Sequence, residues 1–166
     1  MSETLVRDYR PGDEERMMDI APRAFAVWAR YGLDYQLDRQ RVAEEYREEA
    51  RGYAERAQAG AKDMAIFVAE RDGVVAGYIV VLVDKQRSER FGVKWGTLRS
   101  LAVDPDLHHG GIGKALVARA MQWFREQGCE YLEVTTDLNN VAALRLYEGA
   151  GFRALYASLT LTQRLD

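Results

Sequence analysis

The sequence predicts an α/β domain with a mixed, mostly antiparallel central sheet and helices on both of its faces. Three observations lead to this fold class. Apolar runs of strand length alternate with stretches of helical periodicity, a two-residue turn joins two of the strands, and a glycine-rich loop joins another strand to a helix. With 166 residues, 48% of them hydrophobic, the chain can bury one core, so we expect a single domain over residues 1–166.

The first third of the chain favours a strand followed by helices. Residues 5–9 alternate in polarity and run into a Pro-Gly pair, which predicts a short strand closed by a turn. Apolar positions recur every three or four residues over 14–31, with Pro22 as a potential break. Residues 38–59 pair opposite charges at i,i+3 and predict a largely exposed helix, whose surface is either simply solvated or in contact with a substrate.

Two strands come next and form a hairpin. Residues 64–70 and 74–83 are apolar and β-branched, and the Asp72-Gly73 pair between them tolerates the positive φ of a two-residue turn. The second run lacks clean alternation, which indicates a strand that is covered on both faces and central in its sheet. The polar stretch 84–94 is expected to be only a connection.

The second half of the chain alternates strands and helices. The proline after Asp104 ends a strand, and Gly128 and Gly151 are typical of the ends of helices. The expected elements are a strand over 97–103, a helix that begins at Ile112, a strand over 131–135, a helix over 139–150 and a terminal strand pair over 152–165.

The composition argues against several classes of partner. Lys and Arg number 23 against 26 Asp and Glu, which leaves a net charge of −3 and no positive field for nucleic acid. No run of about 18 apolar residues occurs in the sequence, so we expect no membrane span. The single cysteine, Cys129, cannot form a disulfide within the chain, and the first residues carry no apolar signal core, so we expect a cytoplasmic protein.

A glycine-rich loop carries the clearest chemical signal. Residues 108–114, His-His-Gly-Gly-Ile-Gly-Lys, lie between a strand and a helix. The first N–H groups of a helix have no partner within it, the helix dipole places about half a positive charge there, and glycines let an anion approach the main chain. The loop is therefore either a phosphate site, with Lys114 as an added charge, or a turn for close helix packing.

Two common nucleotide-binding motifs do not fit this loop. A Walker loop needs a glycine where His108 stands and a hydroxyl residue after the lysine, where Ala115 stands. A dinucleotide fingerprint needs a third glycine at the position of Leu116, and a parallel unit of strands where this chain predicts a hairpin.

Two motifs resemble the GNAT family of N-acetyltransferases. Residues 103–105, Val-Asp-Pro, followed by residues 108–113, are similar to the family's strand end and its Arg/Gln-x-x-Gly-x-Gly/Ala loop, with a histidine at the first loop position. Residues 140–152, Asn-Val-Ala-Ala-Leu-Arg-Leu-Tyr-Glu-Gly-Ala-Gly-Phe, match the family's later helix at every motif position. The resemblance is clear over about 97–152 and faint before residue 64.

The resemblance implies acetyl-CoA as the cosubstrate and a seat for it. The strand before the loop would diverge from its neighbour and offer main-chain groups to the pantetheine arm, the loop would hold the pyrophosphate, and Asn140 would touch the cofactor or brace the loop. His108 would donate to a phosphate in the place of arginine or glutamine. The implied cofactor-binding residues are Leu101, Ala102, Val103, His108, His109, Gly110, Gly111, Ile112, Gly113, Lys114 and Asn140.

The resemblance also implies direct attack of a primary amine on the thioester. Tyr147 would protonate or stabilise the departing thiolate, since a phenol with a pKa near ~10 is protonated at neutral pH; otherwise it is a core aromatic. Thr97 and Arg99 stand where relatives often carry glutamate. Glu133 resembles the base used by N-terminal-amine acetyltransferases of the bacterial ribosomal protein type, and it would take the proton of the amine. The alternatives to Glu133 are a water relay, Glu44 and Glu45.

The remaining partners are less defined by the sequence. The acceptor is expected to be a small amine or a peptide N-terminus, in a pocket built from the first two helices and the 84–94 connection. Adjacent histidines have poor chelating geometry and no cysteine or acidic cluster supports them, so no metal is expected. The resemblance allows a homodimer. The rival functions are a regulatory module that binds acyl-CoA and an enzyme for another acyl-CoA.

Overall fold

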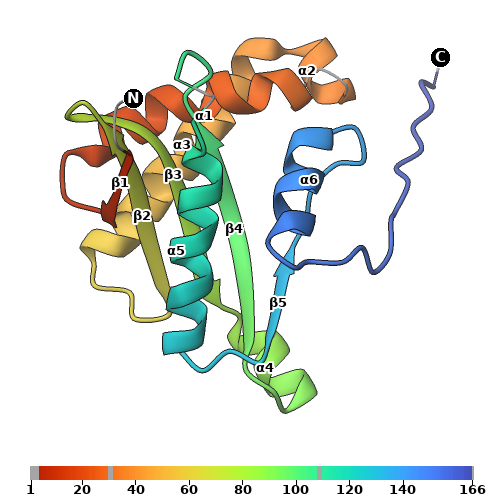
Figure 1. The fold of residues 1–166 in the computed structure, drawn as a ribbon. Helices are drawn as coiled ribbons and strands as arrows, with labels where there is room; N and C mark the ends of the chain where they lie inside the picture. Colours follow the sequence, from red (N-terminus) through yellow and green to blue (C-terminus); the bar gives the residue numbers. More distant parts are fainter. Residues whose placement is uncertain (1–3, 30–31, 108–109, 166) are drawn as a thin grey trace.

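A computed structural model describes residues 4–29, 32–107 and 110–165 of the chain (Figure 1). Two residues expected in the glycine loop, His108 and His109, lie outside the described residues. The elements in chain order are β1 (Thr4–Asp8), α1 (Asp13–Ala29), α2 (Leu33–Leu37), α3 (Arg39–Gln58), β2 (Met64–Arg71), β3 (Val74–Val83), α4 (Lys85–Phe91), β4 (Trp95–Val103), α5 (Ile112–Glu126), β5 (Tyr131–Val134) and α6 (Val141–Gly149).

The described strands form one sheet in the order β1-β2-β3-β4-β5. Neighbouring strands run antiparallel except β4 and β5, which run parallel. The expected mixed, mostly antiparallel sheet is therefore confirmed. The turn between β2 and β3 uses Asp72 at φ 52° and Gly73 at φ 77°, left-handed angles that match the twist of a two-residue hairpin.

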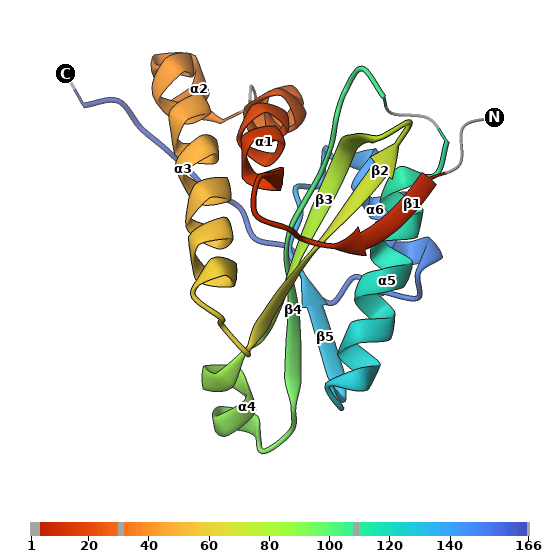
Figure 2. The same cartoon turned by 90° about the vertical axis from the view of Figure 1, so that its left-hand side faces the viewer.

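Helices cover both faces of the sheet, which Figure 2 shows nearly edge-on. On one face α5 buries Leu116 and Phe124 in a core shared with β2, β3 and β4. On the other face α1 and α3 contribute Ile20 and Tyr53 to a second core. β3 lies between the two cores and is buried along most of its length, as its unbroken apolar run predicts.

Two short helices, α2 and α4, were not expected. α4 lies in the 84–94 stretch, which we had expected to be only a connection. Asp84 caps α4 by accepting the backbone N–H of Arg87 at 2.9 Å, and Gly92 ends it in a left-handed conformation. A helix this short and polar has no apolar periodicity. Only its capping residues, Asp84 and Gly92, could have indicated it in the sequence. α1, by contrast, continues through Pro22 as one helix.

The expected terminal strand pair is not formed. Residues 152–165 contain no helix or strand and lead away from the body of the molecule (Figure 1). Gly151, at φ 100°, turns the chain after α6, and Arg153 donates to the carbonyl oxygen of Glu148 at 3.2 Å. The tail has a sequence of high strand propensity, but a strand needs a neighbouring edge, and none of the described strands pairs with it. Its exposed large apolar side chains are Leu155, Tyr156, Leu159, Leu161 and Leu165.

Candidate functional site

The sheet opens between β4 and β5. The two strands pair only over residues 95–98 and 131–134. At the next residue β4 carries a bulge, in which Arg99 is one residue too many for the register with β3. A bulge bends its strand and interrupts regular pairing. Beyond it β4 and β5 diverge, as Figure 1 shows, and no described strand pairs with this edge of β4.

The open edge of β4 presents main-chain groups to the gap. The N–H of Asp104 donates to the carbonyl oxygen of Ala76 at 2.8 Å, which places the main-chain groups of Asp104 on the β3 side. Because these groups alternate sides along a strand, those of Ala102 also point toward β3, whereas those of Leu101 and Val103 point toward the gap. The side chain of Ala102 is buried in the core beneath α1 and α3.

The glycine loop ends where α5 begins. Gly110 at φ 116° and Gly111 at φ 78° hold angles that side chains other than glycine rarely adopt. Gly111 is the N-cap residue of α5, and Ile112 anchors the first turn in the core, with Lys114 exposed beside it. A Cβ at Gly111 would meet nothing within 4 Å, so a ligand has room directly against the main chain. The first N–H groups of α5 are therefore open to an anion, which a helix N-terminus can accept.

Arg71, at the end of β2, supports this loop from behind. Its guanidinium donates to the carbonyl oxygens of Leu107 at 3.5 Å and Gly110 at 3.3 Å, and to the hydroxyl of Thr4 at 3.1 Å. A Cβ at Gly110 would collide with the guanidinium, so this glycine serves the close approach of the arginine. Sequence reasoning missed Arg71, because it lies far from the loop along the chain and belongs to no motif.

A buried carboxylate ties the start of the loop to α1. Asp104 is 3% exposed and accepts hydrogen bonds from Arg16 at 2.7 Å, Arg23 at 2.8 Å and the N–H of Asp106 at 3.0 Å. Burial alone would raise the pKa of this carboxyl, but the bonds from Arg23, Asp106 and Arg16 outweigh burial and hold the pKa below its ordinary value. In the sequence, only the spacing of Arg16 and Arg23, two turns apart on one helix face, could have indicated that both bind the same carboxylate.

α6 packs against the first turn of α5. A Cβ at Gly113 would approach Cδ2 of Leu146 to 3.3 Å, so the glycine allows the two helices to lie close together. Asn140 is the N-cap residue of α6, and its side-chain oxygen accepts the N–H of Ala143 at 3.1 Å. The contact that the structure gives to Asn140 is therefore with α6, and its side chain also lines the pocket described below.

Tyr147, on α6, lies in the α5-side core. It is 8% exposed, and its ring meets that of Phe152 edge-on with 5.9 Å between the centroids. Burial raises the pKa of its hydroxyl to about 12. The hydroxyl is therefore protonated at neutral pH, as a proton donor must be, but it is a weaker acid than an exposed tyrosine. It can stabilise an anion by a hydrogen bond more readily than by full proton transfer.

Glu133, on β5, is held by α4. Its carboxylate accepts a hydrogen bond from the guanidinium of Arg87, which also lies over the ring of Trp95 at 5.4 Å from the ring centroid. The neighbouring Leu132 packs on the α5-side core, so Glu133 faces the opposite side, that of α1 and α3. The register places Thr97 beside Glu133, and the buried Thr97 hydroxyl has no hydrogen-bond partner within the described chain.

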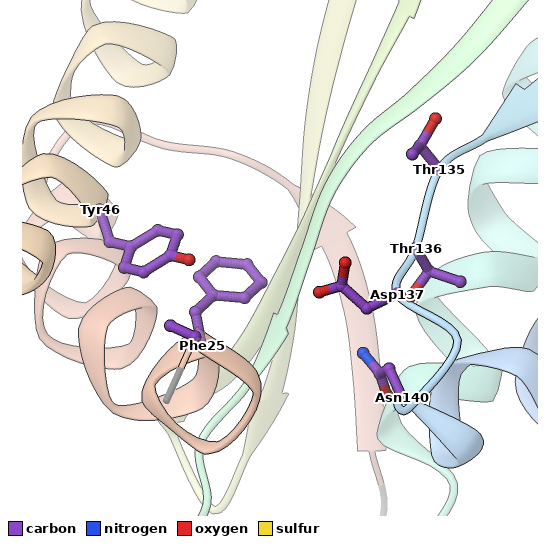
Figure 3. A pocket seen from close by; sticks show the side chains of 7 residues that line it. Phe25, Tyr46, Thr135, Thr136, Asp137 and Asn140 are labelled. Atoms are coloured by element: carbon purple, nitrogen blue, oxygen red, sulfur yellow. The ribbon is translucent and has the colours of Figure 1, made fainter. Parts of the chain in front are cut away.

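A pocket of about 210 Å³ lies across the mouth of the gap. Figure 3 shows its walls, with α1 and α3 on one side and the segment after β5 on the other. We expected the first two helices to contribute, and α1 and α3 do, but the 84–94 stretch does not line the pocket. The lining residues are Phe25, Ala29, Tyr46, Thr135, Thr136, Asp137 and Asn140.

The structure thus gathers most of the predicted residues around one gap. The strand edge, the glycine loop and α6 meet at the start of α5, whereas Glu133 lies on the other face with Arg87. Within residues 4–29, 32–107 and 110–165, no group of three or more His, Cys, Asp or Glu side chains is placed to hold a metal ion. In the same part of the chain, no helix is long and apolar enough to cross a membrane.

The sheet thus opens beside a helix N-terminus that is capped by glycine, so a strand edge and unpaired N–H groups lie in one gap. The profile of the Acetyltransferase (GNAT) family matches residues 16–152, and the chain belongs to this family. The resemblance of the two sequence motifs is therefore confirmed.

Curated relatives match nearly the whole chain. A mycothiol acetyltransferase of Sanguibacter keddieii is 32% identical over 163 residues, which are 97% of this chain and 47% of that protein. A mycothiol acetyltransferase of Thermobispora bispora is 30% identical over 148 residues, or 89% of this chain and 45% of that protein. The chain therefore spans about half the length of the curated relatives it matches.

Solved structures share the fold. The PaiA N-acetyltransferase of Thermoplasma acidophilum, in complex with coenzyme A, has a TM-score of 0.73 at 18% identity and covers 94% of this chain and 93% of its own. An aminoglycoside N-acetyltransferase in complex with CoA has a TM-score of 0.67 at 16% identity, and the match covers 99% of this chain and 97% of that protein's chain. At such identities the likeness shows the fold alone.

Proposed function

We propose that the chain is an acetyl-CoA-dependent N-acetyltransferase that moves an acetyl group to a primary amine. The observation that carries the proposal is the opening of the sheet between β4 and β5, directly beside the glycine-capped start of α5. A strand edge and a helix N-terminus in one gap suit a ligand with amides at one end and phosphates at the other. Membership of the family supports acetyl transfer.

Acetyl-CoA fits this seat by its chemistry. The amides of its pantetheine arm can exchange hydrogen bonds with the main-chain groups of Leu101 and Val103, as an added strand would. Its pyrophosphate would meet the N–H groups of Gly111, Ile112 and Gly113 and the positive end of the α5 dipole, with Lys114 close by. Such binding uses the main chain and therefore tolerates a range of loop side chains.

The proposed reaction is direct transfer within one ternary complex. The lone pair of the neutral amine attacks the acetyl carbonyl carbon, the new C–N bond forms, and the C–S bond breaks with its electron pair on sulfur. The nitrogen then loses its proton to a base, and the sulfur accepts a hydrogen bond or a proton from the hydroxyl of Tyr147. The products are an amide and free coenzyme A.

Glu133 is the proposed base, through a water molecule. Arg87 holds its carboxylate in place, and a water molecule can carry the proton from the amine to the carboxylate. The two alternatives from the N-terminal helices have less support. Glu44 and Glu45 are exposed and pair with arginines on their own helix.

The cofactor seat is tested by two matched variants of Gly111. An added Cβ meets no neighbour, and Asp and Asn both tolerate the left-handed conformation better than most residues, so Gly111→Asp and Gly111→Asn differ mainly in charge. We expect acetyl-CoA to raise the unfolding temperature of the parent chain. Gly111→Asp should weaken acetyl-CoA binding at least about tenfold, or about 1.4 kcal/mol, and Gly111→Asn distinctly less.

The parent chain should also release free thiol from acetyl-CoA with one or more members of a panel of amines and peptides. A parent chain whose unfolding temperature ignores acetyl-CoA, and that releases no thiol with any acceptor, would contradict the proposed function.

A further inference from the structure

The pocket at the mouth of the gap has an aromatic wall and an acidic wall. The rings of Phe25 and Tyr46 lie with their centroids 4.9 Å apart and an interplanar angle of 33°. Figure 3 shows the side chain of Asp137 pointing toward them from the segment after β5. Among the described residues, the carboxylate of Asp137 has no hydrogen-bond or ion-pair partner, so its charge is available to a ligand.

Acidic groups lie close to the Tyr46 hydroxyl at the pocket. Burial raises the pKa of the Tyr46 hydroxyl, and the negative charges of Glu49, Asp137 and Glu45 raise it further. Among the described residues, Arg99 donates to the Tyr53 hydroxyl at 3.2 Å. Tyr53 in turn donates to Glu49 at 2.6 Å. A cation between the rings and Asp137 would gain from both walls, by attraction to the ring faces and to the carboxylate.

From this geometry we propose that the pocket binds an ammonium group of the acceptor other than the one that is acetylated. The inference rests on the proposed function. The attacking nitrogen must be neutral, so a positive charge that stays bound during the reaction belongs to a second nitrogen. The acceptor class is therefore small molecules with at least two basic amino groups. A volume of about 210 Å³ suits one end of such a molecule, since pockets for drug-sized ligands usually exceed about 300 Å³.

The test compares two acceptors that differ by one nitrogen. Initial rates of thiol release at saturating acetyl-CoA are measured with 1,4-diaminobutane and with 1-aminobutane. We expect a kcat/KM for the diamine at least about tenfold above that for the monoamine. Asp137→Asn should remove most of this preference through KM, leaving kcat for the diamine and both constants for the monoamine nearly unchanged.

Three further variants keep the result interpretable. Glu89→Gln removes an equal charge from the exposed surface of α4, outside the pocket, and should retain the preference. Tyr46→Phe keeps the ring and should retain most of it, whereas Tyr46→Leu should lose it. Circular dichroism and the acetyl-CoA-induced rise in unfolding temperature verify that each variant folds and binds the cosubstrate.

Three outcomes would overturn the inference. The first is equal kcat/KM for the two acceptors in the parent chain. The second is an equal loss for both acceptors in Asp137→Asn, especially with an altered pH–rate profile, which would make Asp137 a base for the reacting nitrogen. The third is an equal loss in Glu89→Gln, which would indicate long-range attraction only. Failure of the proposed function looks different, because then the parent chain releases no thiol with any amine.

Discussion

At the scale of single residues, the raised pKa of Tyr147 limits what its hydroxyl can contribute. With a pKa of about 12, the phenol stays protonated at neutral and moderately alkaline pH. Tyr147→Phe should therefore lower kcat by roughly 10- to 100-fold with the affinity for acetyl-CoA nearly kept, because only the bond to the departing sulfur is lost. Steady-state kinetics and a binding isotherm test this, and unchanged turnover would remove the proposed role.

Because that pKa is so high, the alkaline side of the pH–rate profile below about pH 10 should be the same in Tyr147→Phe and the parent chain. A Tyr147→Phe profile that loses an alkaline limb near neutral pH would show that the hydroxyl titrates far lower than its burial implies.

The proposed base, Glu133, can be tested independently of Tyr147. Glu133→Gln keeps the size of the side chain but cannot accept a proton, so kcat/KM should fall and the acid limb of the pH–rate profile should change shape. Glu130→Gln, just before β5, is the control, because its side chain lies at the exposed end of the strand and bonds to the N–H of Lys94 at 3.2 Å. If both variants keep the parent profile, Glu133 is not the base.

Motif residues could be predicted from the sequence because each motif is contiguous. Gly111 and Tyr147 stand inside such motifs, and their positions at a helix start and on a helix stripe follow from local pattern alone. Asp137 could not be predicted in the same way. Its proposed role depends on its position opposite Phe25 and Tyr46, and no local pattern brings together residues so far apart in the chain.

At the scale of secondary-structure elements, Asp104 joins the end of β4 to α1. Asp104→Asn leaves two arginines facing a neutral amide, and should lower the free energy of unfolding by about 2 kcal/mol. This loss is smaller than the full cost of breaking a buried ion pair, because both arginines are partly exposed. Asp106→Asn is the matched control, since that carboxylate is mostly exposed and its bond to Arg23 should be worth at most about 1 kcal/mol. Urea unfolding of the three proteins measures both values.

The pH dependence of the same stability follows from the lowered pKa of Asp104. A carboxyl whose pKa is lower in the folded than in the unfolded chain stabilises the fold fully above the unfolded value, near ~3.9, and loses this contribution as the pH falls through the folded value. The parent chain should therefore lose stability below about pH 4 more steeply than Asp104→Asn. Parallel curves for the two proteins in acid would contradict the assignment.

Elements with a strong local pattern were predicted closely. The hairpin strands, the helix after the glycine loop and the helix that ends at Gly149 all follow from periodicity and turn residues. α4 was missed because its seven residues are polar except for Phe91 and carry no apolar stripe. The terminal strands were expected wrongly, because the pattern of residues 152–165 favours a strand but cannot supply the edge that a strand requires.

At the scale of the whole molecule, the fold class could be predicted because the order of elements and the central position of β3 restrict the ways in which the sheet can be built. The opening of the sheet was expected only by resemblance to a family. The bulge at which the opening begins, with the extra residue Arg99 in β4, is invisible in the sequence, since a bulge is a mismatch between two strands and not a property of either one.

The open edge of β4 would also make the lifetime of the chain depend on the proposed ligand. A molecule that occupies the gap takes the place of a missing strand, and it can do so only while the sheet is folded. At a free concentration a hundred times the Kd, such a ligand adds about 2.7 kcal/mol to the stability, which lowers the unfolded fraction about a hundredfold. Proteases that attack the unfolded chain would then degrade it more slowly when the ligand is plentiful and faster when it is scarce.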